Sequence, residues 1–421
     1  MEDFLLKEFF NVERWQSAID IGVGKKIDKG ELRALTKPET RIRLYQAIIT
    51  DNYAISPPRI ALIPKDNGEF REVMICENID RIVLSIINNM FFELFPEFVH
   101  DSCKSYRSGI GCGKVVKEAS AECVKVKGNI VGKKYDLKKY FDRVKLKYID
   151  AMFDKMECKY GKSKIIDIVR EFYHCNLLFD ADGNLIEEYK SIKQGTATSS
   201  FLADALLYHI DEELSKVKGI KYWRYSDDIL ILGENYEAAD LLIKYRLAEM
   251  ELQINEKKEE ILDKDHYFKF LGFSICGDKI TLSKRRLKDF QKEVQSRTVN
   301  QRKTTPTKAI NSLNNYLYKG NGQYSFATSV LPIINVQHDI DEMNEFILDC
   351  IRGVMTGKGK IGGLGYVNDR PEGVVLRGTG RNVKANRVKT PKEIDGYLSL
   401  RCAQNALFTS RAVYETLVRT L

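Results

Sequence analysis

Two short acidic strings stand at the ends of apolar, strand-like segments. Tyr225-Ser226-Asp227-Asp228 separates the aromatic YWRY from the strongly apolar ILIL, a pattern typical of a β-hairpin. Asp136 ends the alternating segment VGKKYDL over 131–137. Asp is common in tight turns, so the first string alone fits a plain turn slightly better than a functional site. Packing does not explain a carboxylate at the tip of an apolar strand, because buried Asp is rare unless paired or bound to metal.

The two acidic strings together indicate a functional site if their strands are neighbours. Asp136, Asp227 and Asp228 then converge, and two charged carboxylates 4 Å apart repel by about 4 kcal/mol at an effective dielectric near 20. Divalent cations remove this penalty, and carboxylate oxygens are ligands that Mg²⁺ prefers. Two ions about 3.5–4 Å apart would stabilise the attacking and leaving oxygens of an in-line phosphoryl transfer. We therefore predict a site for two Mg²⁺ ions, with Mn²⁺ as a substitute.

Hydrophobic periodicity predicts an α+β chain rather than a doubly wound sheet. Hairpins are expected over 59–75, 222–232 and 267–282, and a strand over 131–137. Helices are expected over 1–50, from Ile79 to Leu94, over about 145–158, 201–214 and 236–250, and from Ser283 to about 355. Residues 357–382 hold eight glycines among basic residues, which favours a loop before a terminal helical stretch.

Net charge is distributed unevenly along the 421 residues. The chain has 67 Lys and Arg against 59 Asp and Glu, a net charge of +8. Residues 281–421 hold 23 basic and 12 acidic side chains, or +11, so residues 1–280 carry 44 and 47, or −3. A basic last third fits a polyanion partner, most simply nucleic acid, and fits a solvated basic surface equally well on charge alone.

Several classes of protein are excluded early. The start MEDFLLKEFF lacks the basic region of a signal peptide, and no window approaches 18 uncharged apolar residues, so no membrane partner is expected. The nine cysteines are scattered and never spaced C-x-x-C, which argues against a disulfide framework and a zinc site. A reducing, cytoplasmic setting fits best.

Seven ordered motifs resemble those of reverse transcriptases, over about residues 55–280. They are IPKDNGEFR (63–71), SYRSGIGCGKVV (105–116), YDLKKYFD (135–142), QGTATSS (194–200), YSDDI, NEKK (255–258) and FLGF (270–273). The resemblance implies a right-hand polymerase with fingers, a palm whose antiparallel sheet bears the Y-x-D-D hairpin, and a helical thumb. Two departures are that Ser199-Ser200 replaces the usual Ser-Pro, and that 105–116 lacks the usual Gly-Phe-Arg run.

The resemblance also implies a role for each matching residue. Asp136, Asp227 and Asp228 become the catalytic carboxylates, with Leu137 beside them as a further metal ligand. The residues implied to bind the incoming dNTP are Lys65, Arg71, Phe141, Gln194, Gly195 and Lys258. Phe141 is the implied steric gate against a ribose 2′-hydroxyl, and Phe270, Leu271 and Gly272 form the implied primer grip.

Plainer interpretations exist for several of these residues. Tyr140 is adjacent to Phe141, and either side chain fits the core. Gln194-Gly195 also fits an ordinary turn, and Lys65 and Arg71 flank a hairpin tip where charges are usually solvated. Lys257 is next to Lys258, and either fits a solvated face.

The domain organisation that the resemblance implies has five parts. An N-terminal helical extension covers 1–55, and fingers cover 56–130 and 160–200. The palm covers 131–159 and 201–282, a helical thumb covers 283–356, and a basic Gly-rich loop with a helical extension covers 357–421. Nucleic-acid contacts are expected from Lys284, Arg285, Arg286 and Lys288 in the thumb, and from Arg381, Lys384, Arg387 and Lys389 after it, with strong salt dependence.

The expected function is RNA-directed DNA polymerisation. The chain shows no RNase H cluster, no Cys/His endonuclease module and no retron signatures, and is most similar to compact bacterial anti-phage reverse transcriptases. The expected partners are a structured non-coding RNA as template, a DNA product and dNTPs. Untemplated or protein-primed synthesis, and a non-catalytic RNA-binding scaffold, are the alternatives. Nothing in the sequence determines the oligomeric state.

Overall fold

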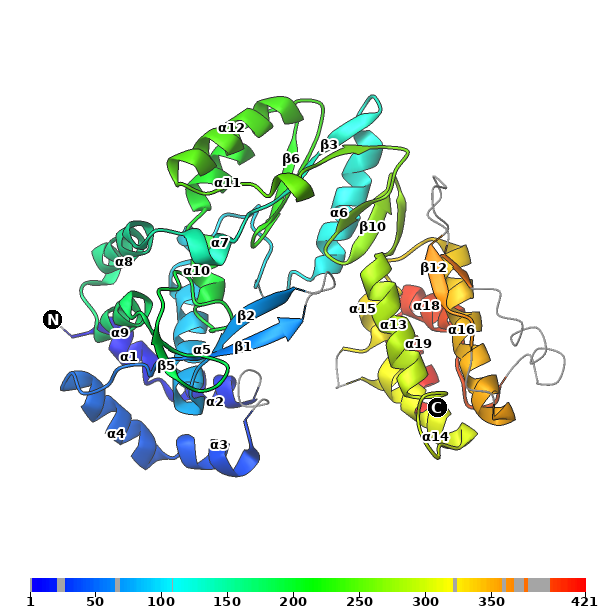
Figure 1. Cartoon of the computed structure of the whole chain (residues 1–421), viewed down its shortest axis with the longest axis horizontal. Coiled ribbons are helices and arrows are strands. Elements are labelled where there is room, and N and C mark those ends of the chain that lie inside the picture. Colours follow the sequence, from blue (N-terminus) through cyan, green and yellow to red (C-terminus); the bar gives the residue numbers. More distant parts are fainter. Residues whose placement is uncertain are drawn as a thin grey trace. The chain divides into compact units, whose positions relative to one another are not determined.

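The computed structural model describes residues 2–20, 27–64, 69–107, 109–320, 324–357, 361–366, 375–377 and 394–421 (Figure 1). The chain folds into two compact units, each built from separate stretches of sequence. The first unit is Met1–Gly109, Lys133–Ile231 and Asn235–Glu260, and the second is Ile110–Gly132, Leu232–Glu234 and Ile261–Leu421. The finer division into fingers, palm and thumb stays a prediction.

The first unit begins with four short helices, as the sequence predicts for residues 1–50. They are α1 (Phe4–Phe9), α2 (Val12–Asp20), α3 (Lys29–Leu35) and α4 (Pro38–Ile49). Asp3 caps α1 through the backbone N–H of Leu6 and also accepts the backbone N–H of Lys164 at 2.8 Å, at the start of α9 (Lys164–His174). The Trp15 indole donates to the Phe9 carbonyl at 2.9 Å. The helices α1, α2 and α4 contribute buried side chains to the core of the first unit, whereas α3 has none.

A four-stranded sheet follows, in the order β2-β1-β4-β5. Its predicted hairpin is confirmed as β1 (Arg59–Pro64) paired antiparallel with β2 (Phe70–Ile75), and β4 (Leu177–Phe179) and β5 (Leu185–Glu187) complete it. The long helix α5 (Asn78–Leu94) is also confirmed, because its apolar residues recur at helical spacing and are buried. After it come η2 (Pro96–Phe98), α7 (Tyr140–Arg143) and α8 (Leu146–Tyr160).

The other four-stranded sheet has the order β6-β7-β3-β8. Its strands are β3 (Ile130–Asp136), β6 (Lys221–Tyr225), β7 (Asp228–Leu232) and β8 (Glu260–Asp263), with α12 (Tyr236–Glu249) and η3 (Glu256–Lys258) between the last two. The β6–β7 hairpin agrees with the prediction for 222–232. β3 runs antiparallel to both neighbouring segments. Toward β7, Leu137 N–H donates to Asp227 O and Gly233 N–H donates to Val131 O; toward the β8 segment, Asn255 N–H donates to Asp136 O and Lys264 N–H donates to Asn129 O.

The predicted helix over 201–214 is wrong in one respect, because it is two helices. They are α10 (Ser199–Ala205) and α11 (Tyr208–Ser215), separated at Leu206 and Leu207. The carbonyls of Ala203 and Asp204 would accept the next helical N–H groups, but they instead accept the Arg224 guanidinium at 3.1 and 2.7 Å. The helix breaks where a buried arginine takes its carbonyls.

In the second unit, α6 (Cys112–Lys125) covers a three-stranded sheet of β9 (Phe268–Phe270), β10 (Phe273–Cys276) and β11 (Lys279–Leu282) (Figure 1). The predicted hairpin over 267–282 is confirmed and gains β9. The expected helical stretch after Ser283 is confirmed as α13 (Lys284–Ser296), α14 (Pro306–Asn314), the π-helical turn η4 (Asn315–Lys319), α15 (Phe326–Val330) and α16 (Gln337–Thr356).

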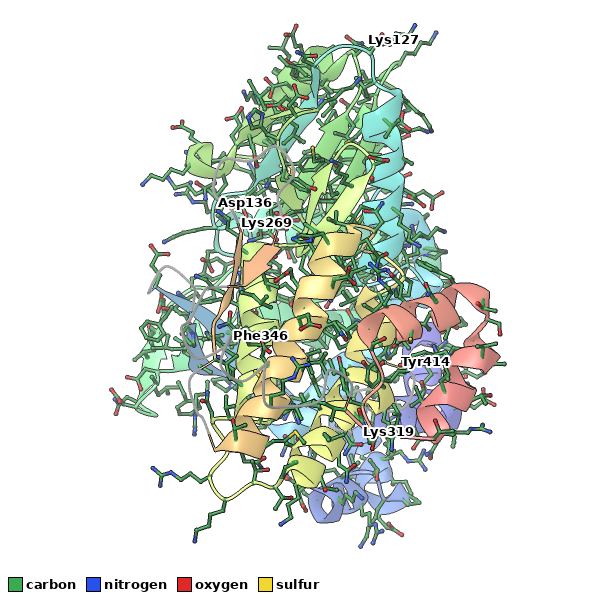
Figure 2. All side chains as sticks on the ribbon, turned by 90° about the vertical axis from the view of Figure 1, so that its right-hand side faces the viewer. Lys127, Asp136, Lys269, Lys319, Phe346 and Tyr414 are labelled. Carbon is green, nitrogen blue, oxygen red and sulfur yellow. The ribbon has the colours of Figure 1, made fainter. Side chains whose placement is uncertain are left out.

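The C-terminal residues complete the helical part of this unit. The loop predicted over 357–382 is wrong in part, because β12 (Leu364–Tyr366) and β13 (Val375–Arg377) pair antiparallel within it. The predicted terminal helical stretch is confirmed as α18 (Leu400–Thr409) and α19 (Arg411–Arg419). Phe346 in α16 is fully buried, and Tyr414 in α19 donates to the Tyr318 carbonyl at 3.0 Å (Figure 2). No helix in the described ranges is long and apolar enough to span a membrane. All nine cysteines are free thiols.

Two glycines of the second unit provide a matched test of this packing. Gly277 and Gly320 share a φ of +56°, but a Cβ at Gly277 would meet nothing within 4 Å, whereas at Gly320 it would lie 2.0 Å from the Tyr324 carbonyl oxygen. Gly277→Ala should cost about 1 kcal/mol of stability, the usual left-handed strain. Gly320→Ala should cost roughly 3 kcal/mol or more, because the backbone must also move. Chemical denaturation compares the two, and equal losses would contradict this packing.

Candidate active site

The three predicted carboxylates lie at the tips of neighbouring strands. β3 ends at Asp136, β7 begins at Asp228, and the two strands are adjacent in the sheet (Figure 2 labels Asp136). The backbone N–H of Leu137 donates to the Asp227 carbonyl at 3.2 Å, which joins the end of β3 to the turn of the hairpin. The structure therefore brings the two acidic strings together, as the sequence predicts.

The charges of these neighbouring carboxylates raise the pKa of Asp227 and Asp228. Burial raises the pKa of Asp227, and the charge of Asp136 raises it further. Burial, followed by the charges of Asp227 and Asp136, raises the pKa of Asp228 to about 6. Arg71, Lys134 and Lys258 act in the opposite direction on one or both groups. The site thus holds mutually repelling, half-buried acids that cations stabilise.

Lys258 is the cation in direct contact with this cluster. Its Nζ lies 2.8 Å from Asp136 Oδ2, and the Asn255 amide lies 3.4 Å from Asp136 Oδ1. Lys257, the neighbouring candidate, instead lines a cavity of about 660 Å³ with Lys138 and Lys244. Of the two lysines, Lys258 is the one that the fold directs to the carboxylates.

The donor chemistry of the cluster fits a divalent cation. The side-chain ligand atoms of Asp136, Asp227 and Asp228 are all carboxylate oxygens, which Mg²⁺ prefers, and a cation would offset the charge repulsion that raises the pKa of Asp227 and Asp228. Leu137 can offer only its backbone carbonyl, because its side chain carries no donor atom. Within the described ranges, no three His, Cys, Asp or Glu side chains are gathered closely enough to hold a metal as they stand. Lys258 holds one oxygen of Asp136 in this arrangement.

A buried arginine sets the position of the acidic turn. Arg224 on β6 makes a two-point ion pair with Asp211, Nε to Oδ1 at 2.8 Å and Nη2 to Oδ2 at 2.5 Å, and both side chains are fully buried. Tyr222 adds a hydrogen bond to Asp211 at 2.6 Å. Arg224 Nη1 also donates to the Ser226 carbonyl at 3.2 Å, so the ion pair is tied to the residue that precedes Asp227.

The turn itself is strained, and a second chain of hydrogen bonds holds it. Ser226 has a φ of +57°, which is uncommon for a residue with a side chain. Its backbone N–H donates to Ser105 Oγ at 2.9 Å, and that hydroxyl donates to Asp204 Oδ1 at 2.5 Å. Asp204 is fully buried, and its Oδ2 has no hydrogen-bond partner among the described atoms. This conformation persists because its surroundings determine it.

Sequence reasoning missed these supporting residues. The available signal was an arginine inside the apolar strand YWRY, together with Asp204 and Asp211 inside a segment expected to be a buried helix. Buried charges need partners, so the three could have been predicted to meet. For Ser105, the only signal in the sequence was its position at the start of the motif over 105–116.

The predicted nucleotide-binding residues have mixed outcomes. Lys65 lies outside the described residues. Arg71 lies exposed on β2 and is close enough to Asp227 to lower that group's pKa. Gly195 has a φ of +105°, and a Cβ there would lie 2.9 Å from the Met74 carbonyl oxygen. The close approach that this glycine permits is therefore to the backbone of β2, and Gln194 O accepts the Met74 N–H at 2.6 Å.

The structure distinguishes Phe141 from Tyr140. The Tyr140 hydroxyl donates to the Ala203 carbonyl at 2.9 Å, and the ring is 1% exposed, so Tyr140 is a core residue. Phe141 is 9% exposed and packs edge-on against Tyr140, with ring centroids 5.6 Å apart. Of the two aromatic rings, Phe141 is the one nearer the surface.

The predicted primer grip is a turn between β9 and β10. Phe270 is buried, so only Leu271 and Gly272, at φ +49° and +81°, form the turn. On α13, Lys284, Arg285 and Lys288 are exposed, whereas the half-buried Arg286 stacks on the Phe273 ring at 4.6 Å. Arg286 is thus not a simple surface cation. Arg381, Lys384, Arg387 and Lys389 lie outside the described residues.

Asp204 provides a pH test of the supporting network. Burial raises its pKa to about 6, with Arg224 opposing. A folded-state pKa above the unfolded value means that this group favours folding below about pH 4, and that the contribution is lost as pH rises to 6. Asp204→Asn should therefore gain stability relative to the parent between pH 4 and 7, by up to about 3 kcal/mol.

Thermal unfolding across this pH range measures that difference. Asp101→Asn, at a carboxylate that is 92% exposed, is the matched control and should track the parent. If the difference in unfolding temperature between Asp204→Asn and the parent stays constant with pH, the buried Asp204 carboxyl does not have a raised pKa.

Comparison with known proteins now identifies the family. The profile of the reverse transcriptase (RNA-dependent DNA polymerase) family matches residues 63–275, just over half of the chain. No curated protein matches significantly.

Among solved structures, apo telomerase from Candida tropicalis is 14% identical with a TM-score of 0.44, over 72% of this chain and 57% of that one. Its form truncated from the C-terminal domain is 14% identical with a TM-score of 0.41, over 55% and 56%. Telomerase from Candida albicans in complex with a TWJ fragment of telomeric RNA is 13% identical with a TM-score of 0.43, over 91% and 69%. The chain spans little more than half the length of the two C. tropicalis structures.

The family match covers the acidic strings at the tips of β3 and β7 and the motifs around them, and the chain belongs to the reverse transcriptase family, the RNA-dependent DNA polymerases.

Proposed function

We propose that this chain copies a structured non-coding RNA into DNA, and that Asp136, Asp227 and Asp228 form its catalytic centre. The observation that carries the proposal is the junction of β3 and β7, where the three half-buried carboxylates lie at adjoining strand ends and the charge of Asp136 raises the pKa of Asp227 and Asp228. Asp136 and Asp227, with the Leu137 carbonyl, would hold two Mg²⁺ ions, and Mn²⁺ would substitute. The ions would stabilise the attacking and leaving oxygens of phosphoryl transfer.

Residues around the carboxylates would position the dNTP. Arg71 would supply positive charge for the triphosphate, as would Lys65, which lies outside the described residues. Gln194 and Gly195 lie on the neighbouring segment against β2. Lys258 would leave Asp136 and pair with the departing pyrophosphate. Both Asp136 and the pyrophosphate are anionic, and the Lys258 side chain is 59% exposed, so it can reach solvent on either side of the ion pair. Phe141 would close the sugar site against a 2′-hydroxyl.

The basic last third supports an extended nucleic-acid partner. Its charge of +11 contrasts with −3 in the first 280 residues. In the proposed division, fingers and palm hold the chemistry, the thumb from 283 to 356 holds the template–product duplex, and residues after 357 grip folded RNA. A bacterial anti-phage role in the cytoplasm is part of this proposal.

Metal-dependent incorporation tests the catalytic assignment. Full-length protein with its co-purifying RNA should incorporate dNTPs in Mg²⁺, and Asp227→Asn should lose activity on the order of 100-fold or more, because a neutral amide oxygen replaces a charged carboxylate ligand. Asp101→Asn is the matched control on an exposed carboxylate. Equal incorporation by Asp227→Asn and the parent would contradict the site. Sequencing the product separates a copy of RNA from untemplated synthesis.

The sugar gate is tested by a pair of adjacent substitutions. Phe141→Ala should reduce the preference for dNTP over NTP by about tenfold or more, because a steric obstacle to the 2′-hydroxyl is removed. Tyr140→Phe removes only the hydroxyl that bonds Ala203 and should keep the parent's preference. If Phe141→Ala keeps the preference as well, the gate is another residue.

The contact between Lys258 and Asp136 predicts competition with the metal. In the absence of nucleotide, Lys258→Met should bind Mn²⁺ roughly threefold more tightly, the gain expected from removing a partly exposed ion pair. Electron paramagnetic resonance of free Mn²⁺ measures this affinity without activity. Lys257→Met is the control and should bind Mn²⁺ as the parent does. Weaker binding by Lys258→Met would show that the lysine does not compete for Asp136.

A further inference from the structure

A cavity of about 630 Å³ lies within the second unit, among α13, η4 and α15. Its size is ordinary for a small-molecule site. Its wall combines aromatic and charged side chains, chiefly Arg286, Glu293, Arg297, Tyr316, Tyr324 and Phe326. None of these belongs to the carboxylate site described above. The π-helical turn η4 forms part of the wall, and such turns are frequent at functional sites.

The aromatic part of the wall is continuous. The Phe290 and Phe326 ring centroids are 4.8 Å apart at 31°, and those of Tyr316 and Phe326 are 5.8 Å apart at 36°. Tyr324 also lines the cavity and is 75% exposed. An exposed tyrosine beside packed rings offers a stacking surface to a planar ligand.

Two polar groups in the wall lack partners. Within the described residues, the Arg286 guanidinium makes no hydrogen bond or ion pair, although it is half-buried and stacks on Phe273 at 4.6 Å. In the same residues, the Tyr316 hydroxyl has no hydrogen-bond partner, and burial raises its pKa to about 12. Glu293 accepts from Arg297 at 3.0 Å, and Asp289 also lines the cavity. The wall therefore offers donors, acceptors and flat apolar faces together.

This combination favours a nucleobase over other ligands. Bases stack on tyrosine rings and on guanidinium planes, and their amino groups donate to carboxylates. A free phosphate would not use the rings, and an acidic peptide would meet Asp289 and Glu293. A base that is paired within a duplex cannot enter, so the ligand must be an unpaired nucleotide.

The position of the cavity indicates which strand supplies that nucleotide. A Cβ at Gly272 would lie 3.5 Å from Arg286 Cδ, so the cavity adjoins the turn predicted to grip the primer. The outer face of α13 exposes Lys284, Arg285, Lys288 and Lys292, which suit phosphates. We propose that this cavity binds one unpaired nucleotide of the nucleic acid that lies along α13. The proposal rests on the proposed polymerase function for the presence of that nucleic acid.

Binding without dNTPs tests the proposal. Full-length protein is titrated, at one fixed salt concentration, against a fluorescent RNA hairpin with a single unpaired nucleotide and against the same hairpin fully paired. The parent should bind the first about tenfold more tightly, the usual size of one base stacked on an aromatic ring. RNA–DNA hybrids with the unpaired nucleotide in either strand identify whether RNA or DNA supplies it.

Four variants locate the effect. Tyr324→Ala and Arg286→Gln should each reduce the preference to near unity, while Tyr324→Trp should retain it. Lys292→Gln, on the exposed face of the same helix, should weaken binding of both hairpins equally. Tyr324 is exposed, so its loss leaves the fold intact.

A parent without preference, or a preference that survives Tyr324→Ala and Arg286→Gln, overturns the proposal. If either of these binding results is found and the protein still incorporates dNTPs in Mg²⁺, only the cavity proposal is refuted. If the protein prefers the hairpin with the unpaired nucleotide but incorporates no dNTPs, only the proposed polymerase function is refuted.

Discussion

The ion pair between Arg224 and Asp211 is the interaction on which the candidate active site depends. Both side chains are fully buried, and loss of one partner of such a pair typically costs about 3–5 kcal/mol, because the other charge is left unpaired in the interior. From this pair Arg224 reaches the carbonyls of Ala203, Asp204 and Ser226. One arginine therefore interrupts a helix, anchors a strand and fixes the turn that carries Asp227.

The arrangement explains how a hairpin can present acids that repel one another. Ser226 is held at a positive φ by Ser105 on one side and Arg224 on the other. Asp227 and Asp228 directly follow this fixed residue in the chain. The hydrogen bond from the Leu137 N–H to the Asp227 carbonyl places Asp136, at the end of β3, beside them. Lys258 and Arg71 supply compensating charge from two further segments. The polar network beneath the turn holds the backbone conformation that places Asp227 and Asp228 beside the end of β3.

Local patterns in the sequence predicted most helices and strands, and predicted that the two acidic strings converge. The hairpins over 59–75, 222–232 and 267–282 and the helix from Ile79 to Leu94 follow from periodicity, which burial on one face imposes. The meeting of Asp136 with Asp227 was predictable because both end apolar strands. The break at Leu206 was not, since it comes from Arg224, a contact between segments that leaves no periodic signal. Likewise, only three-dimensional packing separates Lys258 from Lys257 and Phe141 from Tyr140, and shows that Gly195 faces β2.

The central claim is that Asp136 and Asp227 hold the divalent ions of a polymerase. The most direct measurement is an anomalous difference map from crystals of the full chain with Mn²⁺, an RNA template, a primer and a non-hydrolysable dNTP. We predict Mn²⁺ peaks between the carboxylates of Asp136 and Asp227, with Lys258 moved away from Asp136. Mn²⁺ bound elsewhere, while the nucleotide occupies its site and Lys258 remains on Asp136, would contradict the claim.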